Sequence, residues 1–457
     1  MGIINNFAKL FEPYTDKLFG ATWADLNSVK DMYVREFIIE EAEGRLVNSD
    51  GLPYSLDLYV LELLDFVQAC MGHKSVREQI ERAGFVHGGA SPFSQMVYSA
   101  VALAQITGED KTMWDMDLNV FLSEETAISA NYTPRTASTD LILKLGECFP
   151  IQTVEALFDH TQRIFGSTEN FGLKEAALQL WDQLLNEYAE TEQTIDPNVA
   201  NGLLDFIVSA LGSAGEQAQF LRARGYSVAS TLTKAMISTI ADKVPELMGE
   251  SIRASTSDPS DIVQITALRV FQRYRESVPK EQLLPFQASI VTSVWRFLTS
   301  KADDDDPEDS QDVLTELMET LRSAITINYS IVLDTEHLQI DIPHIIFAIA
   351  NKGVDNPHLL ALIRDTFDDI TEGAPEIYIP LCGKILPSLM EILDTPDNNM
   401  HGIALEILDV LLLNGTSPLP LGGRHVLPRL SADKSPLAIR LTKLTPVHKW
   451  QMPALKK

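Results

Sequence analysis

Apolar residues recur at spacings of three and four positions along almost the whole chain. This spacing places apolar side chains on one face of an α-helix, which can then pack against the rest of the protein. The clearest runs are Leu56, Tyr59, Val60, Leu63, Leu64 and Val67; Leu178, Leu180, Trp181, Leu184 and Leu185; and Ile403, Leu405, Ile407, Leu408 and Leu411. No stretch of alternating apolar and polar residues with a hairpin turn separates these runs. The pattern predicts an all-α protein.

Helix-breaking residues fall between these runs at short intervals. Asp or Ser before Pro combines a helix N-cap with a proline in the first turn. The breakers are Gly51 to Pro53, Gly88 to Pro92, Asp196-Pro197, Asp258-Pro259, Pro279, Asn356-Pro357, Pro375 and Thr395-Pro396. We therefore expect many helices of about 12–20 residues joined by short turns.

The starts of several expected helices resemble one another and suggest a repeat. Each carries a small residue that lets two helices approach closely: Ala177, Ala223, Ala267, Ala361 and Ala404. Their spacings are 46, 44, 94 and 43 residues, and the spacing of 94 is read as two units, one of them stretched by an insert. A period of about 40–47 residues with two helices each is typical of HEAT and armadillo repeats.

The period predicts an α-solenoid of HEAT or armadillo-like repeats over residues 1–421. About eight or nine antiparallel helix pairs would form a right-handed superhelix whose second helices line a concave face. An unrelated helical bundle is the alternative, since any all-helical chain gives approximate coincidences of spacing. The stretch from Asp258-Pro259 to Ala267 resembles a HEAT repeat, in which Asp caps the second helix and Arg joins a charged ladder. Gln264 stands where that Arg is expected, which puts a charged ladder at this point in doubt.

The net charge of the chain limits the kinds of molecule that it is expected to bind. Of the 457 residues, 36 are Lys or Arg and 64 are Asp or Glu, so the formal net charge is −28. Residues 422–457 carry eight basic residues and one acidic residue, a balance of +7, whereas residues 1–421 carry −35. The surplus of acid disfavours direct binding to nucleic acid or anionic membranes and favours basic protein partners. The segment 422–457 shows no repeat pattern and is expected to be a disordered basic tail that contains prolines.

Cysteine content and hydropathy indicate the compartment. Three Cys residues without a Cys-x-x-Cys pair cannot form a disulfide framework, which fits a reducing environment. No stretch approaches the roughly 20 apolar residues that cross a bilayer, and the first residues lack the features of a secretory signal. We expect a soluble, intracellular protein.

Motifs for catalysis and for metal binding are absent. The sequence has no phosphate-binding loop, dinucleotide-binding glycine motif, metalloprotease His-Glu-x-x-His or nucleophile elbow. The nine His residues form no metal-ligand spacing. We therefore expect a non-enzymatic protein without catalytic residues, cofactors or bound metal.

A run of acidic residues at about 301–311 is the most suggestive local feature. Its carboxylates repel one another and should keep the segment a solvated loop. Clustered acids of this kind can attract basic protein segments, although a plain spacer between two helices is the alternative. The candidate contacts for a basic cargo are Asp303, Asp304, Asp305, Asp306, Glu308 and Asp309, together with Glu124 and Glu125.

Three segments carry a family resemblance. Met113 to Leu122, followed by Glu124, Glu125, Tyr132 and Arg135, resembles a pattern of the importin-β (karyopherin-β) superfamily. Gln219-Phe220-Leu221-Arg222-Ala223-Arg224 is similar to a repeat start of the large importins, although Arg222 and Arg224 can also be read as exposed solenoid charges. The third segment is Gln311 to Thr371. Their order looks most like importin-nine-type receptors over about residues 15–415, as a central or partial fragment.

The resemblance implies a nuclear transport receptor that carries basic cargo, such as core histones or ribosomal proteins, into the nucleus. Such a protein would shuttle between cytoplasm and nucleus, bind nucleoporins and be regulated by the small GTPase Ran. Family members are roughly twice as long, and the N-terminal repeats that bind Ran are expected to have no counterpart here. The alternative function is a HEAT-repeat scaffold subunit of a multiprotein complex.

Overall fold

The computed structural model describes residues 12–40, 56–85, 91–125, 132–167, 170–300, 311–396 and 398–416. The chain divides into two compact units, Met1–Ser323 and Ala324–Lys457. All regular elements in the described residues are helices, with no strand among them, so the prediction of an all-α protein is confirmed. The prediction of one continuous solenoid over residues 1–421 stays a prediction, and the expected tail at 422–457 lies outside the described residues.

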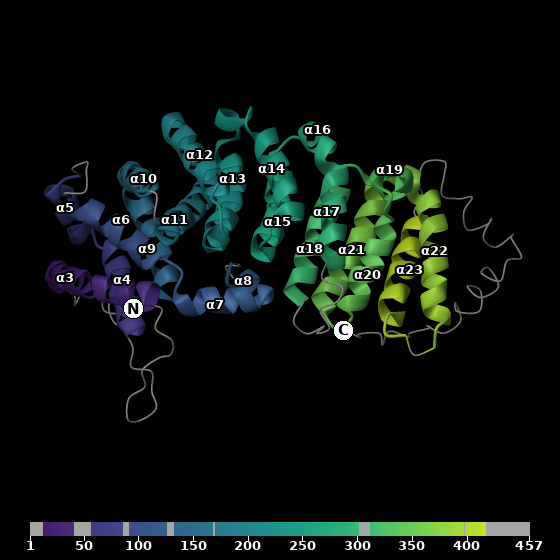
Figure 1. Ribbon diagram of the computed structural model, residues 1–457, viewed down its shortest axis with the longest axis horizontal. Helices are drawn as coiled ribbons and strands as arrows, with labels where there is room; N and C mark the ends of the chain where they lie inside the picture. Colours follow the sequence, from purple (N-terminus) through teal and green to yellow (C-terminus); the bar gives the residue numbers. More distant parts are fainter. Residues whose placement is uncertain are drawn as a thin grey trace, which may run out of the picture. The chain divides into compact units, whose positions relative to one another are not determined.

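Unit 1 is built mainly from helix pairs, which Figure 1 shows side by side. The first helices of the pairs are α3 (Thr15–Tyr33), α6 (Pro92–Leu103), α10 (Pro150–Phe165), α12 (Pro197–Leu211), α14 (Val244–Ser257) and α17 (Gln287–Ser300). The second helices are α4 (Leu56–Met71), α9 (Pro134–Cys148), α11 (Phe171–Glu190), α13 (Gln219–Ile240), α15 (Asp261–Ser277) and α18 (Gln311–Ile325), which runs through the boundary into unit 2.

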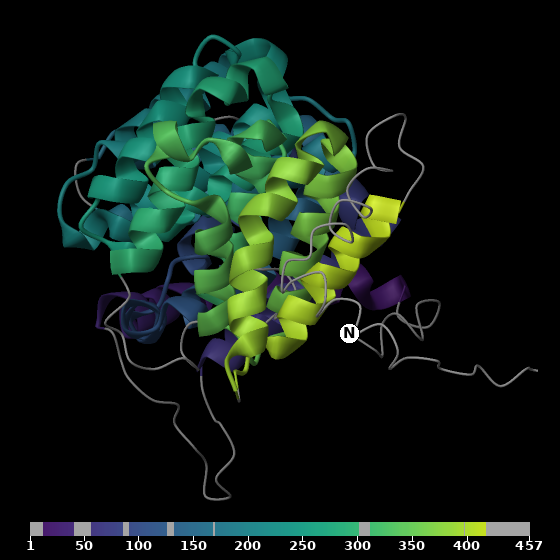
Figure 2. The same ribbon diagram turned by 90° about the vertical axis from the view of Figure 1, so that its right-hand side faces the viewer.

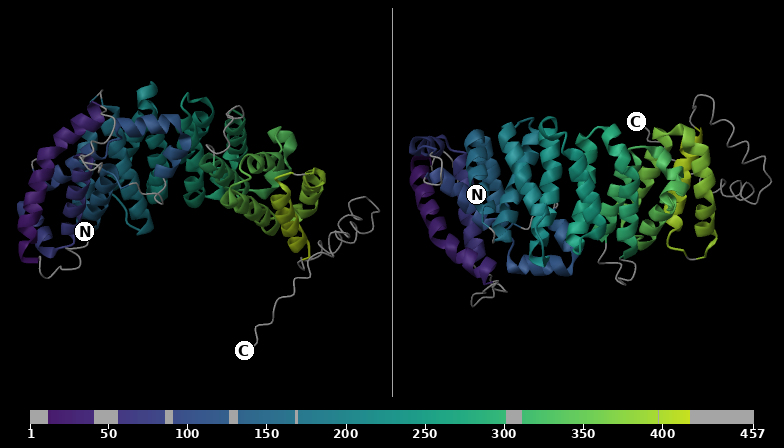
Figure 3. Two further views of the ribbon diagram at one scale, coloured as in Figure 1. Left: turned by 90° about the horizontal axis from the view of Figure 1, so that it is seen from below. Right: turned by 45° about the horizontal axis from the view of Figure 1, so that its top comes forward.

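Shorter elements lie before, within or between these pairs. They are η1 (Glu12–Tyr14), the π-helix η2 (Val34–Ile39), α5 (Lys74–Ala83), α7 (Gly108–Met116), α8 (Leu118–Glu125), η3 (Glu216–Ala218), α16 (Lys280–Leu283) and η4 (Leu284–Phe286). Among them, α7 and α8 do not pair as a repeat. They lie across the ends of the second helices α13 and α15 (Figures 1 and 3).

Unit 2 continues the pattern with two pairs, α20 (Ile342–Lys352) with α21 (Pro357–Gly373), and α22 (Tyr378–Asp394) with α23 (His401–Thr416). The last pair packs together, and α23 also packs on α21 (Figure 2). The remaining elements of unit 2 are η6 (Tyr329–Leu333), α19 (Thr335–Leu338) and η7 (Pro375–Ile377).

The five alanines from which the repeat period was predicted all lie in second helices, as the repeat hypothesis requires. They lie in the second helices α11, α13, α15, α21 and α23, and α18 occupies the gap that the spacing of 94 leaves. Four of the five alanines are buried, and Ala361 is half-buried. The HEAT-type periodicity predicted from small residues is therefore confirmed in both units.

Caps explain why the helices begin at the predicted breakers. The side chain of Asp196 accepts a hydrogen bond from the backbone N–H of Asn198, and the Ser91 hydroxyl accepts one from Ser94. Each capping residue precedes a proline in the first turn, where the missing N–H costs nothing.

A glycine lets two of these helices pack closely. Any side chain at Gly146 of α9 would clash with Leu184 of α11, because its Cβ atom would lie only 2.7 Å away.

Candidate protein-binding site

The residues selected from the sequence as cargo contacts fall largely outside the described structure. Asp303, Asp304, Asp305, Asp306, Glu308 and Asp309 belong to the segment 301–310, which is not among the described residues. Glu124 and Glu125 are the last residues of α8, and their side chains are also outside the description. Their role in binding stays a prediction.

The helix that ends with Glu124 and Glu125, α8, is hydrogen-bonded to the helix that follows the acidic segment, α18. The side-chain oxygen of Asn119 in α8 accepts hydrogen bonds from the backbone N–H groups of Asp312 (2.9 Å) and Val313 (3.2 Å). These N–H groups belong to the first turn of α18, which begins directly after the acidic segment. No sequence signal could have joined residues 193 positions apart.

Helices α7 and α8 are anchored on unit 1 by an aromatic cluster. Trp114 is 3% exposed and lies 5.5 Å from the Phe121 ring and 5.6 Å from the Phe220 ring, measured between centroids. Beside this cluster, the Gln219 amide donates a 2.6 Å hydrogen bond to the Asp115 carboxylate. The motif around Trp114 that carried the family resemblance is therefore a packing and anchoring element.

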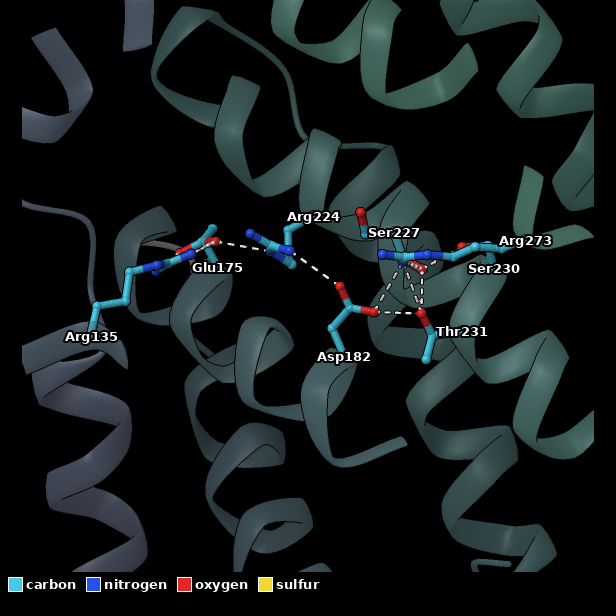
Figure 4. A network of polar contacts seen from close by, with 8 residues as sticks. All are labelled: Arg135, Glu175, Asp182, Arg224, Ser227, Ser230, Thr231 and Arg273. Atoms are coloured by element: carbon cyan, nitrogen blue, oxygen red, sulfur yellow. Dashed lines mark hydrogen bonds and ion pairs between the residues drawn. The ribbon is translucent and has the colours of Figure 1, made fainter. Parts of the chain in front are cut away.

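A chain of buried ion pairs connects the second helices of unit 1 (Figure 4). Arg135 in α9 holds Glu175 in α11 through two hydrogen bonds of 2.7 and 2.8 Å, and also donates to the carbonyl oxygen of Ala104. Glu175 accepts a second guanidinium, that of Arg224 in α13, at 3.1 Å. Arg224 continues to Asp182, also in α11, at 3.2 Å. One carboxylate thus serves two arginines from neighbouring repeats.

The ion-pair chain ends at α15. Asp182 accepts a 2.5 Å hydrogen bond from the hydroxyl of Thr231 and lies 3.5 Å from the guanidinium of Arg273. Arg273 also donates to Thr231 at 3.0 Å. We call Arg135, Glu175, Arg224, Asp182, Thr231 and Arg273 the ion-pair chain. Because its carboxylates are buried and fully paired, it ties four successive repeats together and leaves no charge free for a partner.

A second buried pair corrects two expectations. Arg222 in α13 holds Asp258 through two hydrogen bonds of 2.9 Å, so this Asp is paired with an arginine of the preceding repeat. Gln264, in the position expected for Arg, instead donates to the backbone oxygen of Asp258 at 2.6 Å. The charged ladder is present, with its arginine supplied by α13. The reading of Arg222 and Arg224 as exposed charges is wrong, since they are only 6% and 5% exposed.

A groove on the second helices α4, α9 and α11 is lined by carboxylates that, unlike those of the ion-pair chain, are mostly not paired with arginine. Its volume is about 460 Å³ and its main lining residues are Gln68, Asp140, Lys144, Glu147, Glu187 and Tyr188. We call these residues the acidic groove. The single lysine is already paired with Glu147 at 2.6 Å. The groove also lies at the C-terminal turns of α9 and α11, where the helix dipole favours a cation.

Asp65 of α4 lies next to this groove, one helical turn before Gln68. Its Oδ1 atom is buried and makes no hydrogen bond within the described residues. Burial, followed by the charges of Glu62 and Asp140, raises the pKa of Asp65, and burial also raises the pKa of Asp140. Among the described residues, neither carboxylate has an ion pair with a Lys or Arg of the kind found in the ion-pair chain. A Lys or Arg side chain from a partner would supply one.

Other kinds of site are not found among the described residues. No group of three or more His, Cys, Asp or Glu side chains in this part of the chain is arranged to hold a metal ion. Within the same part, no helix is both long enough and apolar enough to span a membrane.

Comparison with known proteins identifies related sequences. A family model described as the central HEAT repeats of importin-9 matches residues 87–354. Importin subunit beta-5 of Schizosaccharomyces pombe is 22% identical over 428 residues, which cover 91% of this chain and 39% of that protein. Importin-9 of Drosophila melanogaster is 18% identical over 437 residues, covering 91% of this chain and 40% of that protein. The chain thus spans about two fifths of the length of these curated relatives.

Solved structures also align with the chain. A crystal structure of Kap121p bound to Pho4p aligns with a TM-score of 0.43 and 12% identity, covering 91% of this chain and 45% of that one. A complex of Kap95p with RanGDP aligns with a TM-score of 0.43 and 13% identity, covering 99% of this chain and 57% of that one.

Proposed function

Because this chain belongs to the family defined by the central HEAT repeats of importin-9, we propose that it binds basic proteins as part of a nuclear transport receptor. Its homologues are importin transport receptors, which are not enzymes. The expected role is therefore binding without catalysis, and the cargo would be carried into the nucleus.

The acidic groove is the observation that carries this proposal. It lies on second helices, the ones expected to face a cargo, and its carboxylates outnumber its one lysine, which is already paired. Beside it, Asp65 has a buried oxygen that accepts no hydrogen bond from the part of the chain that the structure describes. Burial and then like charges raise the pKa of Asp65, and burial raises the pKa of Asp140, so a cationic side chain would stabilise both ionised carboxylates.

Core histones and ribosomal proteins are the cargo that the family resemblance suggests. We propose that the acidic segment with Asp303–Asp306, Glu308 and Asp309, together with Glu124 and Glu125, adds long-range attraction for such proteins. Residues 1–421 carry a balance of −35, so the attraction should be strong at low salt and weak at high salt.

Ran, nucleoporins and shuttling between cytoplasm and nucleus belong to the same proposal for the whole receptor. These contacts are proposals for this chain, which spans about two fifths of its curated relatives.

A calorimetric titration with a lysine-rich core-histone peptide at low salt tests the groove. The variant Asp65→Asn, Asp140→Asn, Glu187→Gln should lose about tenfold in affinity, since each partly exposed pair contributes about 0.2–1 kcal/mol. The matched control Asp242→Asn, Glu246→Gln, Glu281→Gln removes three exposed carboxylates elsewhere and changes the net charge equally. If both variants lose the same affinity, the peptide responds only to the net charge of the protein, and the groove is not a binding site.

Replacing the six carboxylates of the segment 303–309 by amides tests the remaining candidates. Affinity for the same peptide should fall at low salt, and the loss should shrink as salt rises. Unchanged affinity at low salt would contradict a role for this segment. A stable stoichiometric complex with other subunits in a pull-down, without basic cargo or nucleoporins, would favour the scaffold alternative.

A further inference from the structure

Helices α7 and α8 contact the N-terminal ends of several second helices in turn (Figures 1 and 3). Asp115 of α7 bonds to Gln219, the first residue of α13, and α8 packs against α15. Gln219 also accepts a 2.7 Å hydrogen bond from Ser260, the residue that caps α15. Asn119 of α8 then reaches the first turn of α18. One short segment therefore touches three repeats beyond its own.

The contacts that hold α7 and α8 in place differ in strength along the segment. Its beginning is held by a capping box between Thr107 and Asp110 and by the buried ring of Trp114. It is joined to α18 through one amide oxygen, Oδ1 of Asn119, which accepts two hydrogen bonds, and the one from Asp312 is exposed. Water can compete with an exposed hydrogen bond far more easily than with a buried aromatic cluster.

We propose that residues 108–125 form a strap that ties the N-terminal ends of α13, α15 and α18 together, with Asn119 as its release point. When the hydrogen bonds to Asn119 break, the first turn of α18 loses a side-chain acceptor for two of its N–H groups and α8 loses these two bonds to another helix, so both segments loosen together. When Asn119 is bound, α18 is held in register with the two repeats before it. The strap is a conformational device of unit 1 and is independent of the proposed cargo.

Hydrogen exchange of the full chain tests the strap. In Asn119→Ala, the N–H groups of Asp312 and Val313 should exchange about five to ten times faster, the usual effect of losing an N-cap. Exchange in α8 should rise as well. Asn119→Asp keeps a side-chain oxygen at a helix N-terminus, so it should restore slow exchange in both segments.

Asn356→Ala supplies a matched control. Asn356 also uses one side-chain oxygen to accept two hydrogen bonds, from His358 at 3.0 Å and Leu359 at 3.1 Å, but it caps its own helix, α21. This variant should change exchange in one segment only. If Asn119→Ala leaves α18 unchanged, or changes α18 without changing α8, Asn119 is not the release point of a strap and the proposal is overturned.

Discussion

The ion-pair chain and the acidic groove both rely on carboxylates of unit 1, yet they use them in opposite ways. In the ion-pair chain, Glu175 and Asp182 are buried and each contacts two arginines. In and beside the groove, Asp65 and Asp140 have raised pKa values, and the only lysine lining the groove already has a partner. A high negative charge therefore does not by itself identify a binding surface. Pairing separates acids that stabilise the fold from acids that are free to bind.

The largest effect should come from breaking the ion-pair chain. Asp182→Ala leaves Arg224 buried without this partner, which typically costs about 3–5 kcal/mol. Chemical unfolding followed by circular dichroism measures the loss. Asp205→Ala, at an exposed position of α12, is the control and should change stability by less than about 0.5 kcal/mol. A loss below about 1 kcal/mol in Asp182→Ala would show that the buried pairs do not hold the repeats together.

The same chemical change beside the groove should not destabilise the protein. Asp65→Asn removes a charge that has unfavourable neighbours and no ion pair with a described Lys or Arg, so the free energy of unfolding should stay the same or rise slightly. Asp182→Asn, in contrast, should lower it, because Arg224 and Arg273 lose a charged partner. If both variants destabilise equally, the distinction between paired and free carboxylates fails.

The pH dependence of stability should separate the two regions further. Burial, then Glu62 and Asp140, raises the pKa of Asp65, so the folded state holds this proton more tightly than the unfolded state. The contribution of Asp65 to stability therefore grows as pH falls towards the raised pKa and is lost as pH rises through it. As pH falls from neutral towards the ordinary aspartate pKa of about 3.9, wild type should gain stability relative to Asp65→Asn. Chemical unfolding of both proteins measures this difference, and the opposite sign would contradict the raised pKa.

The smallest effect is expected where the sequence departs from the HEAT pattern. Gln264→Arg restores the expected residue, yet Asp258 already has a bidentate arginine, Arg222. The free energy of unfolding should change by less than about 0.5 kcal/mol. A gain of more than 1 kcal/mol in thermal or chemical unfolding would mean that the ladder at Asp258 is incomplete.

The repeat architecture could be predicted from sequence because it depends on local patterns. Apolar spacing, caps before proline and alanines such as Ala177 and Ala223 lie within single helices and reveal their faces directly. The period then follows from comparing helices of the same kind.

The site could be predicted only in part, since its contacts join distant residues. Asn119 and Asp312 meet across 193 positions, and Glu187 approaches Asp140 only because α9 and α11 stack. Sequence reasoning instead selected acids that are adjacent in the chain, such as Asp303 to Asp306. It also left open an exposed position for Arg222 and Arg224, because a charged residue in a repeat gives no sign of the carboxylate that buries it.

Proton release on binding tests the free carboxylates most directly. Calorimetric titration with an oligolysine peptide is carried out at a series of pH values from neutral down towards the isoelectric point near 4.6, each in two buffers with different ionisation enthalpies. A bound lysine lowers the raised pKa values of Asp65 and Asp140, so wild type should release protons. Asp65→Asn, Asp140→Asn should release clearly fewer, while the exposed control Asp242→Asn, Glu246→Gln should match wild type. Equal proton release in all three proteins would contradict the claim that the groove carboxylates are held free for a basic partner.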